Sequence, residues 1–340
     1  MEFNGQEFEA DGAESVLDLL LRHDQLISYS CKSGNCQSCL LKSLTGEVIP
    51  AAQRGLKSTL VAQGYFLACQ QPAKLINHCS HIDEQALFGS ARLIEKHFYT
   101  QDICRLRLEL SCSLYYHAGQ FVNLKNANGI SRSYSLASLP SEDEFIELHV
   151  RHKTGGVMSE WVFNEFSAGD FIDVQGPIGE CFYTADNPSK ILMLIGTGTG
   201  AAPLLGIARD AIHCGYAGDI HFYHGASEVE SFYLHDTLSA LQQTVSNFSY
   251  HPCLSPPDVL SPDSISPDPE PELPSKAYQT GFCNEIALSE MNDAANSCLF
   301  ICGNPQMVTT TSKKAFLNGV SIKNIYTDPF EYKDMRKKPR

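Results

Sequence analysis

The feature that most constrains this chain is a run of three closely spaced cysteines followed by a distant fourth. Cys31, Cys36 and Cys39 form a C-x4-C-x2-C pattern, and Cys69 follows well downstream. This spacing is typical of a [2Fe–2S] cluster, because two sulfide-bridged iron ions need four thiolates in a compact cage. Gly34 and the small polar residues beside it let backbone N–H groups turn toward the sulfur atoms. The pattern therefore predicts a cluster-binding loop with these four metal ligands.

A structural zinc site and a set of redox-active thiols are the alternatives for such cysteines. Zinc ribbons usually pair two C-x2-C hairpins, and the chain lacks a second one. The iron–sulfur interpretation is therefore favoured. Eight other cysteines have no partner spacing and are expected to be mostly core thiols; they are Cys79, Cys104, Cys112, Cys181, Cys214, Cys253, Cys283 and Cys298.

The composition limits what the chain can bind. A formal net charge of −14 disfavours nucleic acid, which attracts basic patches. The apolar runs, such as residues 191–195, are far shorter than the roughly 20 residues of a membrane-spanning helix. The first residues also lack the basic and apolar regions of a secretory signal. We therefore expect a cytoplasmic protein with no membrane span.

The periodicity of apolar residues divides the 340 residues into three expected domains, 1–87, 88–186 and 187–340. The first holds the cysteine loop. The second shows the period-two alternation of short strands with one helix, which predicts a small antiparallel barrel. The elements expected in these two domains are strands over 2–8, 104–110, 119–124 and 145–150, and helices over 15–21 and 159–166.

The third domain alternates strands and helices, which predicts a parallel α/β sheet. Strands are expected over 191–195, 220–223 and 299–302, and a helix over 202–211. The alternation of strands and helices stops after His251. Residues 252–275 are rich in Pro, Ser and Asp and cannot build a packed core, so they predict a surface insertion.

Four short motifs occur in a fixed order in the second domain. Gly119-Gln120-Phe121 comes first, Arg132-Ser133-Tyr134-Ser135 and His149-Val150-Arg151 follow, and Gly155-Gly156-Val157-Met158-Ser159 opens the expected helix. The second motif taken alone is equally compatible with a barrel strand that carries a surface arginine. A glycine-rich helix N-terminus, however, is suited to bind a pyrophosphate.

Two further motifs follow strands of the third domain. The run Gly196-Thr197-Gly198-Thr199-Gly200-Ala201 fits G-x-G-x-x-G/A, in which glycines permit a tight turn and close approach to a diphosphate. Such turns also serve packing. A Walker loop is excluded, since no Lys-Ser/Thr follows. The other motif begins with Cys302-Gly303, and its cysteine is either a functional thiol or a buried thiol at a strand end.

In this order the motifs resemble the ferredoxin–NADP reductase superfamily. They are similar in particular to reductase components of bacterial ring-hydroxylating dioxygenases and multicomponent monooxygenases that place a plant-type ferredoxin domain first. The resemblance implies a multidomain α+β and α/β fold, with a β-grasp ferredoxin domain, an antiparallel β-barrel flavin domain and a parallel α/β nicotinamide domain. It also implies FAD, because relatives with FMN usually carry the ferredoxin domain last.

The resemblance further implies roles for single residues. Arg132 would bind the flavin pyrophosphate, Tyr134 would pack on the flavin ring and Ser135 would reach its N5 atom. Cys302 would lie near the nicotinamide, and Phe330, in the motif Tyr326–Phe330, would cover the flavin. Ser135, Cys302 and Phe330 are thus the expected catalytic residues. The remaining implied cofactor-binding residues are His149, Val150, Arg151, Gly156, Val157, Met158, Ser159, Gly196, Thr197, Gly198, Thr199, Gly200 and Gly303.

The choice between NADH and NADPH is predicted from charge. A 2′-phosphate needs Arg or Lys nearby, and residues 210–275 contain neither. Ser227 stands where relatives often have Arg, and Glu228 and Glu230 follow it. Two carboxylates repel a phosphate dianion, so we expect NADH.

The predicted function is that of a monomeric reductase that passes electrons from NADH through FAD and a [2Fe–2S] cluster to a partner oxygenase. A reductase for a deoxysugar dehydrase is the alternative within enzymes, and an iron–sulfur redox sensor without turnover is the alternative outside them. The partner is expected to dock on the rim of the cysteine loop, residues 32–38.

Overall fold

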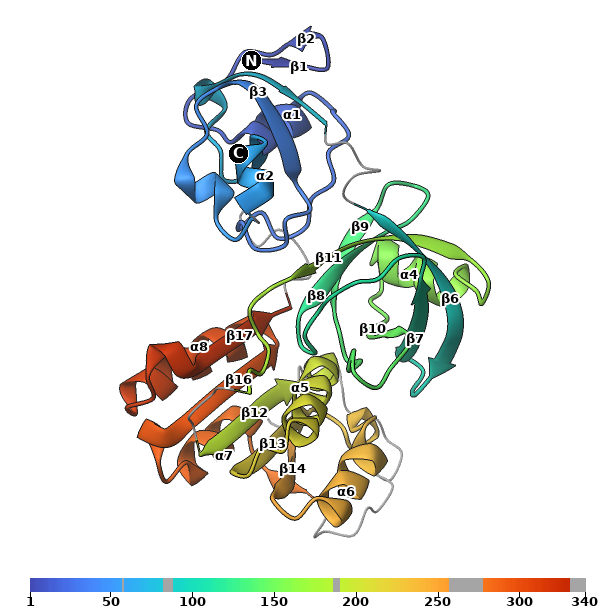
Figure 1. Ribbon diagram of the computed structural model, residues 1–340, viewed down its shortest axis with the longest axis vertical. Coiled ribbons are helices and arrows are strands. Elements are labelled where there is room, and N and C mark those ends of the chain that lie inside the picture. Colours follow the sequence, from blue (N-terminus) through green and yellow to red (C-terminus); the bar gives the residue numbers. More distant parts are fainter. Residues whose placement is uncertain (57, 82–87, 186–189, 257–277, 331–340) are drawn as a thin grey trace.

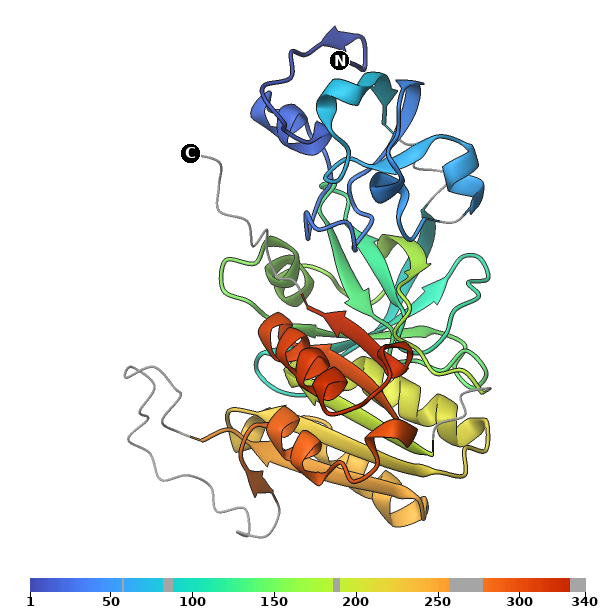
Figure 2. The same cartoon turned by 90° about the vertical axis from the view of Figure 1, so that its left-hand side faces the viewer.

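The computed structural model describes residues 1–56, 58–81, 88–185, 190–256 and 278–330. Three sheets lie one after another along the long axis of the molecule (Figure 1). The sheet with the N-terminus is at one end, an antiparallel barrel is in the middle, and a parallel sheet is at the other end. The view from the side shows the same order (Figure 2).

The N-terminal sheet is mixed, with the strand order β2-β1-β5-β3-β4. Its elements are β1 (Glu2–Phe3), β2 (Gln6–Glu7), α1 (Val16–Arg22), β3 (Leu40–Gly46), α2 (Ser58–Ala62), β4 (Tyr65–Leu67) and β5 (Ile76–Ser80). The strand expected over 2–8 is instead a hairpin, because Asn4 and Gly5 adopt positive φ angles of 49° and 79°. The helix expected over 15–21 is confirmed, with Ser15 accepting a hydrogen bond from the Asp18 amide as its N-cap.

The middle sheet has six antiparallel strands in the order β10-β7-β6-β11-β8-β9. They are β6 (Gly89–Phe98), β7 (Ile103–Leu110), β8 (Phe121–Lys125), β9 (Ser131–Ser135), β10 (Ile146–Arg151) and β11 (Phe171–Ile178). A bridge between Leu136 and Leu148 joins the two outer strands, so the sheet closes into the predicted barrel.

Helix α4 (Val157–Asn164) packs on the barrel core through Met158 and Val162. The Lys96 ammonium on β6 donates to the carbonyls of Val162, Phe163 and Phe166 at 2.8, 3.2 and 2.8 Å. A cation at a helix C-terminus complements the helix dipole. This contact fixes the direction in which the N-terminus of α4 points.

The last sheet is parallel throughout, in the order β15-β14-β13-β12-β16-β17. Its elements are β12 (Ile191–Thr197), α5 (Ala201–His213), β13 (Asp219–Ala226), α6 (His235–Thr244), β14 (Phe248–Leu254), β15 (Gln279–Thr280), α7 (Cys283–Glu290), β16 (Ser297–Gly303), α8 (Pro305–Leu317) and β17 (Ile325–Pro329). The strand order reverses beside β12, which places the ligand crevice of such sheets at the carboxyl ends of β12 and β16.

The predicted start of the Pro-rich insertion, 252–275, is wrong for its first residues. Strand β14 continues through Pro252 to Leu254, and Pro252 pairs in register with His224 of β13. Pairing with β15 begins only at Cys253, so Pro252 has no ladder partner on that side. Residues 257–277 lie outside the described part of the chain.

Short 3-10 turns connect several elements, at Pro50–Gln53, Ala73–Leu75, Gly198–Gly200, Val229–Ser231, Ala294–Asn296 and Ile322–Asn324. None of the helices in the described residues is long and apolar enough to cross a membrane.

Candidate functional site

The four predicted cluster ligands lie together at the barrel-facing end of the N-terminal domain. Cys31 hydrogen-bonds with the Cys36 side chain, and Cys39 with that of Cys69. All four are at most 7% exposed. Electrostatic coupling of Cys36 with Cys39, and of Cys31 with Cys69, places the two pairs next to each other.

The loop that carries these thiols is folded so that its amides face sulfur. Lys32, Gly34 and Gln37 have positive φ angles of 52°, 88° and 56°. The amides of Ser33 and Cys36 donate to the Cys31 Sγ at 3.3 and 3.4 Å. The hydrogen bond from Cys36, together with these amides and against the effect of burial, lowers the pKa of Cys31 to about 4. The loop therefore favours a thiolate at Cys31, while the hydrogen bond with Cys31 and burial raise the pKa of Cys36.

Two adjacent thiol pairs suit a binuclear cluster better than one ion. The four thiols, in two adjacent pairs, fit a [2Fe–2S] cluster, which needs four thiolates in a compact cage.

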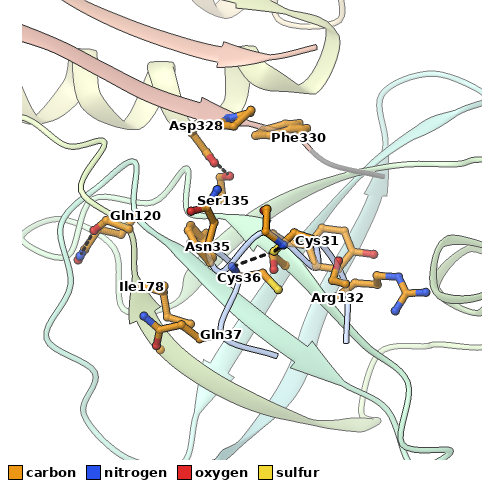
Figure 3. Close-up of a pocket in the computed structure, with 18 of the residues that line it drawn as sticks. Cys31, Asn35, Cys36, Gln37, Gln120, Arg132, Ser135, Ile178, Asp328 and Phe330 are labelled. Atoms are coloured by element: carbon orange, nitrogen blue, oxygen red, sulfur yellow. Dashed lines mark hydrogen bonds between the residues drawn. The ribbon is translucent and has the colours of Figure 1, made fainter. Parts of the chain in front are cut away.

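A cavity of about 1630 Å³ connects the cysteine loop with the barrel and the parallel sheet (Figure 3). It is lined by Cys31 and Cys36 from the loop and by many of the predicted cofactor-binding residues. These are Arg132, Tyr134, Ser135, His149, Arg151, Gly156, Val157, Met158, Ser159, Thr199 and Phe330. Seven other predicted residues are not part of its lining, namely Val150, Gly196, Thr197, Gly198, Gly200, Cys302 and Gly303.

The motif Arg132–Ser135 forms strand β9 at the cavity wall. The Arg132 guanidinium donates to the Ser131 carbonyl at 2.7 Å and to the Tyr29 carbonyl of the N-terminal domain at 3.4 Å. The Ser135 Oγ donates to the Asp328 carboxylate at 2.6 Å (Figure 3). Burial raises the pKa of Asp328 to about 6. Sequence reasoning placed Asp328 in a motif but gave it no role of its own.

The N-terminus of α4 also opens on the cavity, as expected for an anion site. Gly156 is its N-cap, and a Cβ there would lie 2.9 Å from the Lys153 carbonyl. The Ser159 hydroxyl accepts from the Lys153 amide at 3.1 Å and donates to the Gly156 carbonyl at 3.0 Å. This hydroxyl therefore shapes the turn, and the cofactor-binding role that the resemblance implies for Ser159 stays a prediction.

The His149 ring lies in a buried network. Its Nδ1 is 2.9 Å from the Tyr233 hydroxyl of the parallel-sheet domain, and its Nε2 is 3.1 Å from the Glu147 carboxylate. Burial would raise the pKa of Glu147, but the hydrogen bonds of His149 and Arg107 lower it to about 2. The Nδ1 atom of His149 thus joins the barrel to the last domain, while its Nε2 atom is held by Glu147 of the same barrel strand.

The glycine loop after β12 packs closely against β16. A Cβ on Gly200 would lie 2.4 Å from the Cys302 carbonyl oxygen, so only glycine fits there. A Cβ on Gly198 would lie 3.1 Å from the Arg151 Nη1, which shows that this guanidinium reaches the loop from the barrel. The glycines of this loop thus allow close packing against β16, which is one of the two roles that the sequence left open. The loop also faces the Arg151 guanidinium.

Cys302 is completely buried at the end of β16, and burial strongly raises its pKa. Its Sγ lies 3.7 Å from the Cys181 Sγ, which sequence reasoning had treated as a core thiol without a partner. The Phe330 amide donates to the Gly303 carbonyl at 2.7 Å, and Phe330 itself faces the cavity.

The rim at residues 32–38, which the sequence predicted to face a partner protein, lies against the barrel. The Asn123 amide group donates to the Cys36 carbonyl at 2.9 Å. The Lys32 side chain is only 9% exposed and pairs with Asp18 at 3.1 Å. In this arrangement the cysteine loop faces the flavin motif, while Ser33 and Asn35 of the rim are exposed. Docking of a partner on the rim stays a prediction.

Comparisons with known proteins give each domain a match. A family described as a 2Fe-2S iron-sulfur cluster binding domain matches residues 2–74. An oxidoreductase FAD-binding domain family matches residues 90–183, and an oxidoreductase NAD-binding domain family matches residues 194–313.

Relatives match along nearly the whole chain. The chain is 31% identical over 333 residues to the CDP-6-deoxy-L-threo-D-glycero-4-hexulose-3-dehydrase reductase of Yersinia pestis, with 95% of both chains covered. It is 29% identical over 326 residues to the reductase component of the naphthalene 1,2-dioxygenase system of Pseudomonas putida, with 93% of both covered. The Amycolatopsis cytochrome P450 reductase GcoB superposes with a TM-score of 0.66 at 28% identity, over 97% of this chain and 98% of that one.

Fold, site and matches together define an oxidoreductase with iron–sulfur, FAD-binding and NAD-binding domains. The chain belongs to the ferredoxin–NADP reductase superfamily, among the electron-transfer reductases whose ferredoxin domain precedes the flavin and nicotinamide domains. The predicted fold class and the predicted set of cofactors are thereby confirmed.

Proposed function

We propose that this reductase takes electrons from NADH and delivers them, through FAD and the [2Fe–2S] cluster, to a partner oxygenase. The observation that carries the proposal is the shared cavity, because cluster ligands and flavin motif line the same space. FAD, when bound, accepts a hydride from NADH and releases electrons singly, and the cluster carries one electron at a time. The protein's own residues bind and orient these groups.

Residues on different walls of the cavity are proposed to bind different parts of the cofactors. Arg132 and the N-terminus of α4 are proposed to hold the flavin pyrophosphate, with Tyr134 and Phe330 against its ring system. Ser135 and Asp328 are proposed to hold a proton between their oxygens beside the reacting edge of the ring. Arg151, which reaches Gly198, is placed to neutralise a dinucleotide phosphate at the glycine loop.

Cys302 is proposed to act at the nicotinamide end. Its burial and raised pKa favour a neutral thiol, so we assign it a packing role and not that of a nucleophile. The glycines and threonines of the loop 196–200 are proposed to let the dinucleotide backbone approach β12, as in related crevices.

NADH is the proposed donor. Ser227, Glu228 and Glu230 are all exposed just after β13, where a dinucleotide ribose would lie in a sheet of this type. Comparison of kcat/KM for NADH and NADPH tests this. A preference for NADPH would contradict it.

A second candidate acceptor is a deoxysugar dehydrase. The Yersinia pestis relative, whose name states that function, has 31% identity to this chain, against 29% for the naphthalene dioxygenase component. Both candidates use the same electron path. Adding purified oxygenase or dehydrase components to the NADH-reduced protein distinguishes them.

The proposal as a whole is tested by NADH-dependent reduction of cytochrome c. Steady turnover by protein that contains FAD and cluster is expected, whereas full cofactor loading without turnover would favour the redox sensor. We further propose a cytoplasmic monomer with domains at 1–87, 88–186 and 187–340. The separate core of the ferredoxin domain supports the first boundary.

A further inference from the structure

We infer that Asn123 is a positioning residue that holds the ferredoxin domain on the flavin barrel in the arrangement used for electron transfer. This inference rests on the proposed function. Asn123 lies on β8, within the barrel and outside the predicted cofactor-binding residues, and its side chain is completely buried. Burying an unpaired amide is energetically unfavourable, so a fully buried amide is expected to have hydrogen-bond partners.

Every polar atom of the Asn123 side chain has a partner. Its Nδ2 donates to the Cys36 carbonyl and to the Gln175 Oε1, both at 2.9 Å. Its Oδ1 accepts from the Ser133 hydroxyl at 2.7 Å, and the Ser38 hydroxyl lies at 3.5 Å. Two of these partners, Cys36 and Ser38, belong to the cysteine loop, and Ser133 belongs to the flavin motif. One side chain therefore connects the cluster loop directly with strand β9.

The barrel fixes the orientation of this amide. Asn123 pairs in register with Ser133 on β9 and with Gln175 on β11, so its two barrel partners are its cross-strand neighbours. The Ser133 hydroxyl holds the oxygen, which leaves the Nδ2 group pointing at the cysteine loop. Asn123 is thus preorganised before the ferredoxin domain docks, and little entropy is lost when the contact forms.

The other contacts across this interface are weaker. The Ser28 hydroxyl donates to the Gly129 carbonyl at 3.3 Å, and Arg132 donates to the Tyr29 carbonyl at 3.4 Å. In the described part of the chain, no hydrophobic cluster contains residues of both domains. The bond from Asn123 to Cys36 is therefore the shortest of these contacts, and it acts on a cluster ligand.

The test uses the full chain with FAD and cluster bound. Asn123→Asp keeps the shape and the acceptor for Ser133, but it loses both donors and places a carboxylate oxygen against the Cys36 carbonyl. Asn126→Asp is the matched control, because Asn126 is a buried amide after the same strand. Its Oδ1 accepts from the amides of Asn128 and Ile130, a role that aspartate retains.

NADH-driven reduction of ferricyanide reports on the flavin, and that of cytochrome c reports on the cluster. We expect Asn123→Asp to lower the cytochrome c rate about tenfold and to leave the ferricyanide rate unchanged, since an unpaired buried group shifts an equilibrium by about that factor. Small-angle X-ray scattering should show a larger radius of gyration. Asn126→Asp should match the wild type in all three measurements.

Two results would overturn the inference. One is wild-type cytochrome c turnover and wild-type scattering in both Asn123→Asp and Asn123→Ala. The other is an equal loss of the cytochrome c rate and the ferricyanide rate in both variants. Asn123 would then stabilise the barrel without positioning the ferredoxin domain. Failure of the wild type to reduce ferricyanide with NADH would instead contradict the proposed function.

Discussion

The flavin barrel meets its two neighbouring domains in different ways. Toward the nicotinamide domain the contact is a continuous core, in which Cys181 and Tyr183 pack with Leu204 and Ile207 of α5. Charged residues reinforce it, since Arg209 of α5 pairs with Glu142 and Asp143 at 2.8 and 2.9 Å. Toward the ferredoxin domain the contacts described above are polar.

This difference matches what each junction has to do. Hydride transfer needs nicotinamide and flavin held in one geometry, so a packed, charge-reinforced junction is suitable. The cluster must both receive electrons from the flavin and give them to another protein. A polar junction is easier to separate than a hydrophobic one, because its groups regain hydrogen bonds with water. The cysteine loop contacts the barrel through Cys36, so release of this junction would uncover that part of the loop.

The largest expected effect comes from removing a cluster ligand. Cys36→Ser should abolish cluster binding and cytochrome c reduction, because a four-thiolate cage is incomplete with three. Ferricyanide reduction should persist, since the core between barrel and nicotinamide domain is untouched. Iron analysis and visible absorption measure the loss. Cys112→Ser, an exposed cysteine of the barrel, is the control, and equal iron content in both variants would refute the ligand assignment.

The next effect concerns the junction with the nicotinamide domain. Glu147→Gln removes the negative charge and one of the two oxygens that bond with Arg107 and His149, and it should lower the free energy of unfolding by about 2 kcal/mol, the scale of buried charged hydrogen bonds. Because the folded state lowers the pKa of Glu147 to about 2, its contribution is present above the unfolded pKa and is lost as pH falls toward 2.

Urea unfolding at pH 7 and at low pH measures this contribution. The matched control is Glu109→Gln, whose pair with Arg92 is about half exposed on both sides and should matter little. The two variants should differ at pH 7 and converge in acid. Equal stability at pH 7 would show that the Glu147 network does not hold the junction.

A smaller effect is expected at the cavity wall. Asp328 has a raised pKa of about 6, so its ionisation costs folding stability as pH rises from about 4 to about 6. Above pH 6 the carboxylate accepts the Ser135 hydrogen bond more strongly, and NADH–ferricyanide turnover should rise through this pH. Asp328→Asn should remove the inflection and lower kcat several-fold. An unchanged pH profile would exclude Asp328 as its source.

The sequence predicts the secondary-structure elements and motifs of this molecule better than the contacts between them. The cysteine spacing, the order of the motifs and the parallel rhythm of residues 191–302 are local patterns, and the structure bears out the elements they predict. The positions of Asn123 and Asp328 depend on strands far apart in the chain that meet only in the fold. His149 lies at the cavity wall, as its motif predicts, but its hydrogen bond with Tyr233, 84 residues away, has no local sequence signal. The sequence predicts a break at Pro252, yet β14 continues through it because pairing with β15 begins only at Cys253.

The smallest expected effect comes from a weak hydrogen bond between the ferredoxin domain and the barrel. Ser28→Ala removes the 3.3 Å hydrogen bond to the Gly129 carbonyl, in which the hydroxyl is exposed and competes with water. We expect less than about 0.5 kcal/mol in unfolding free energy and cytochrome c turnover equal to that of the wild type. If the junction is held mainly by Asn123, Ser28→Ala combined with Asn123→Asp should behave as Asn123→Asp alone. A large loss in Ser28→Ala would instead mean that the hold on the ferredoxin domain is spread over the whole polar interface.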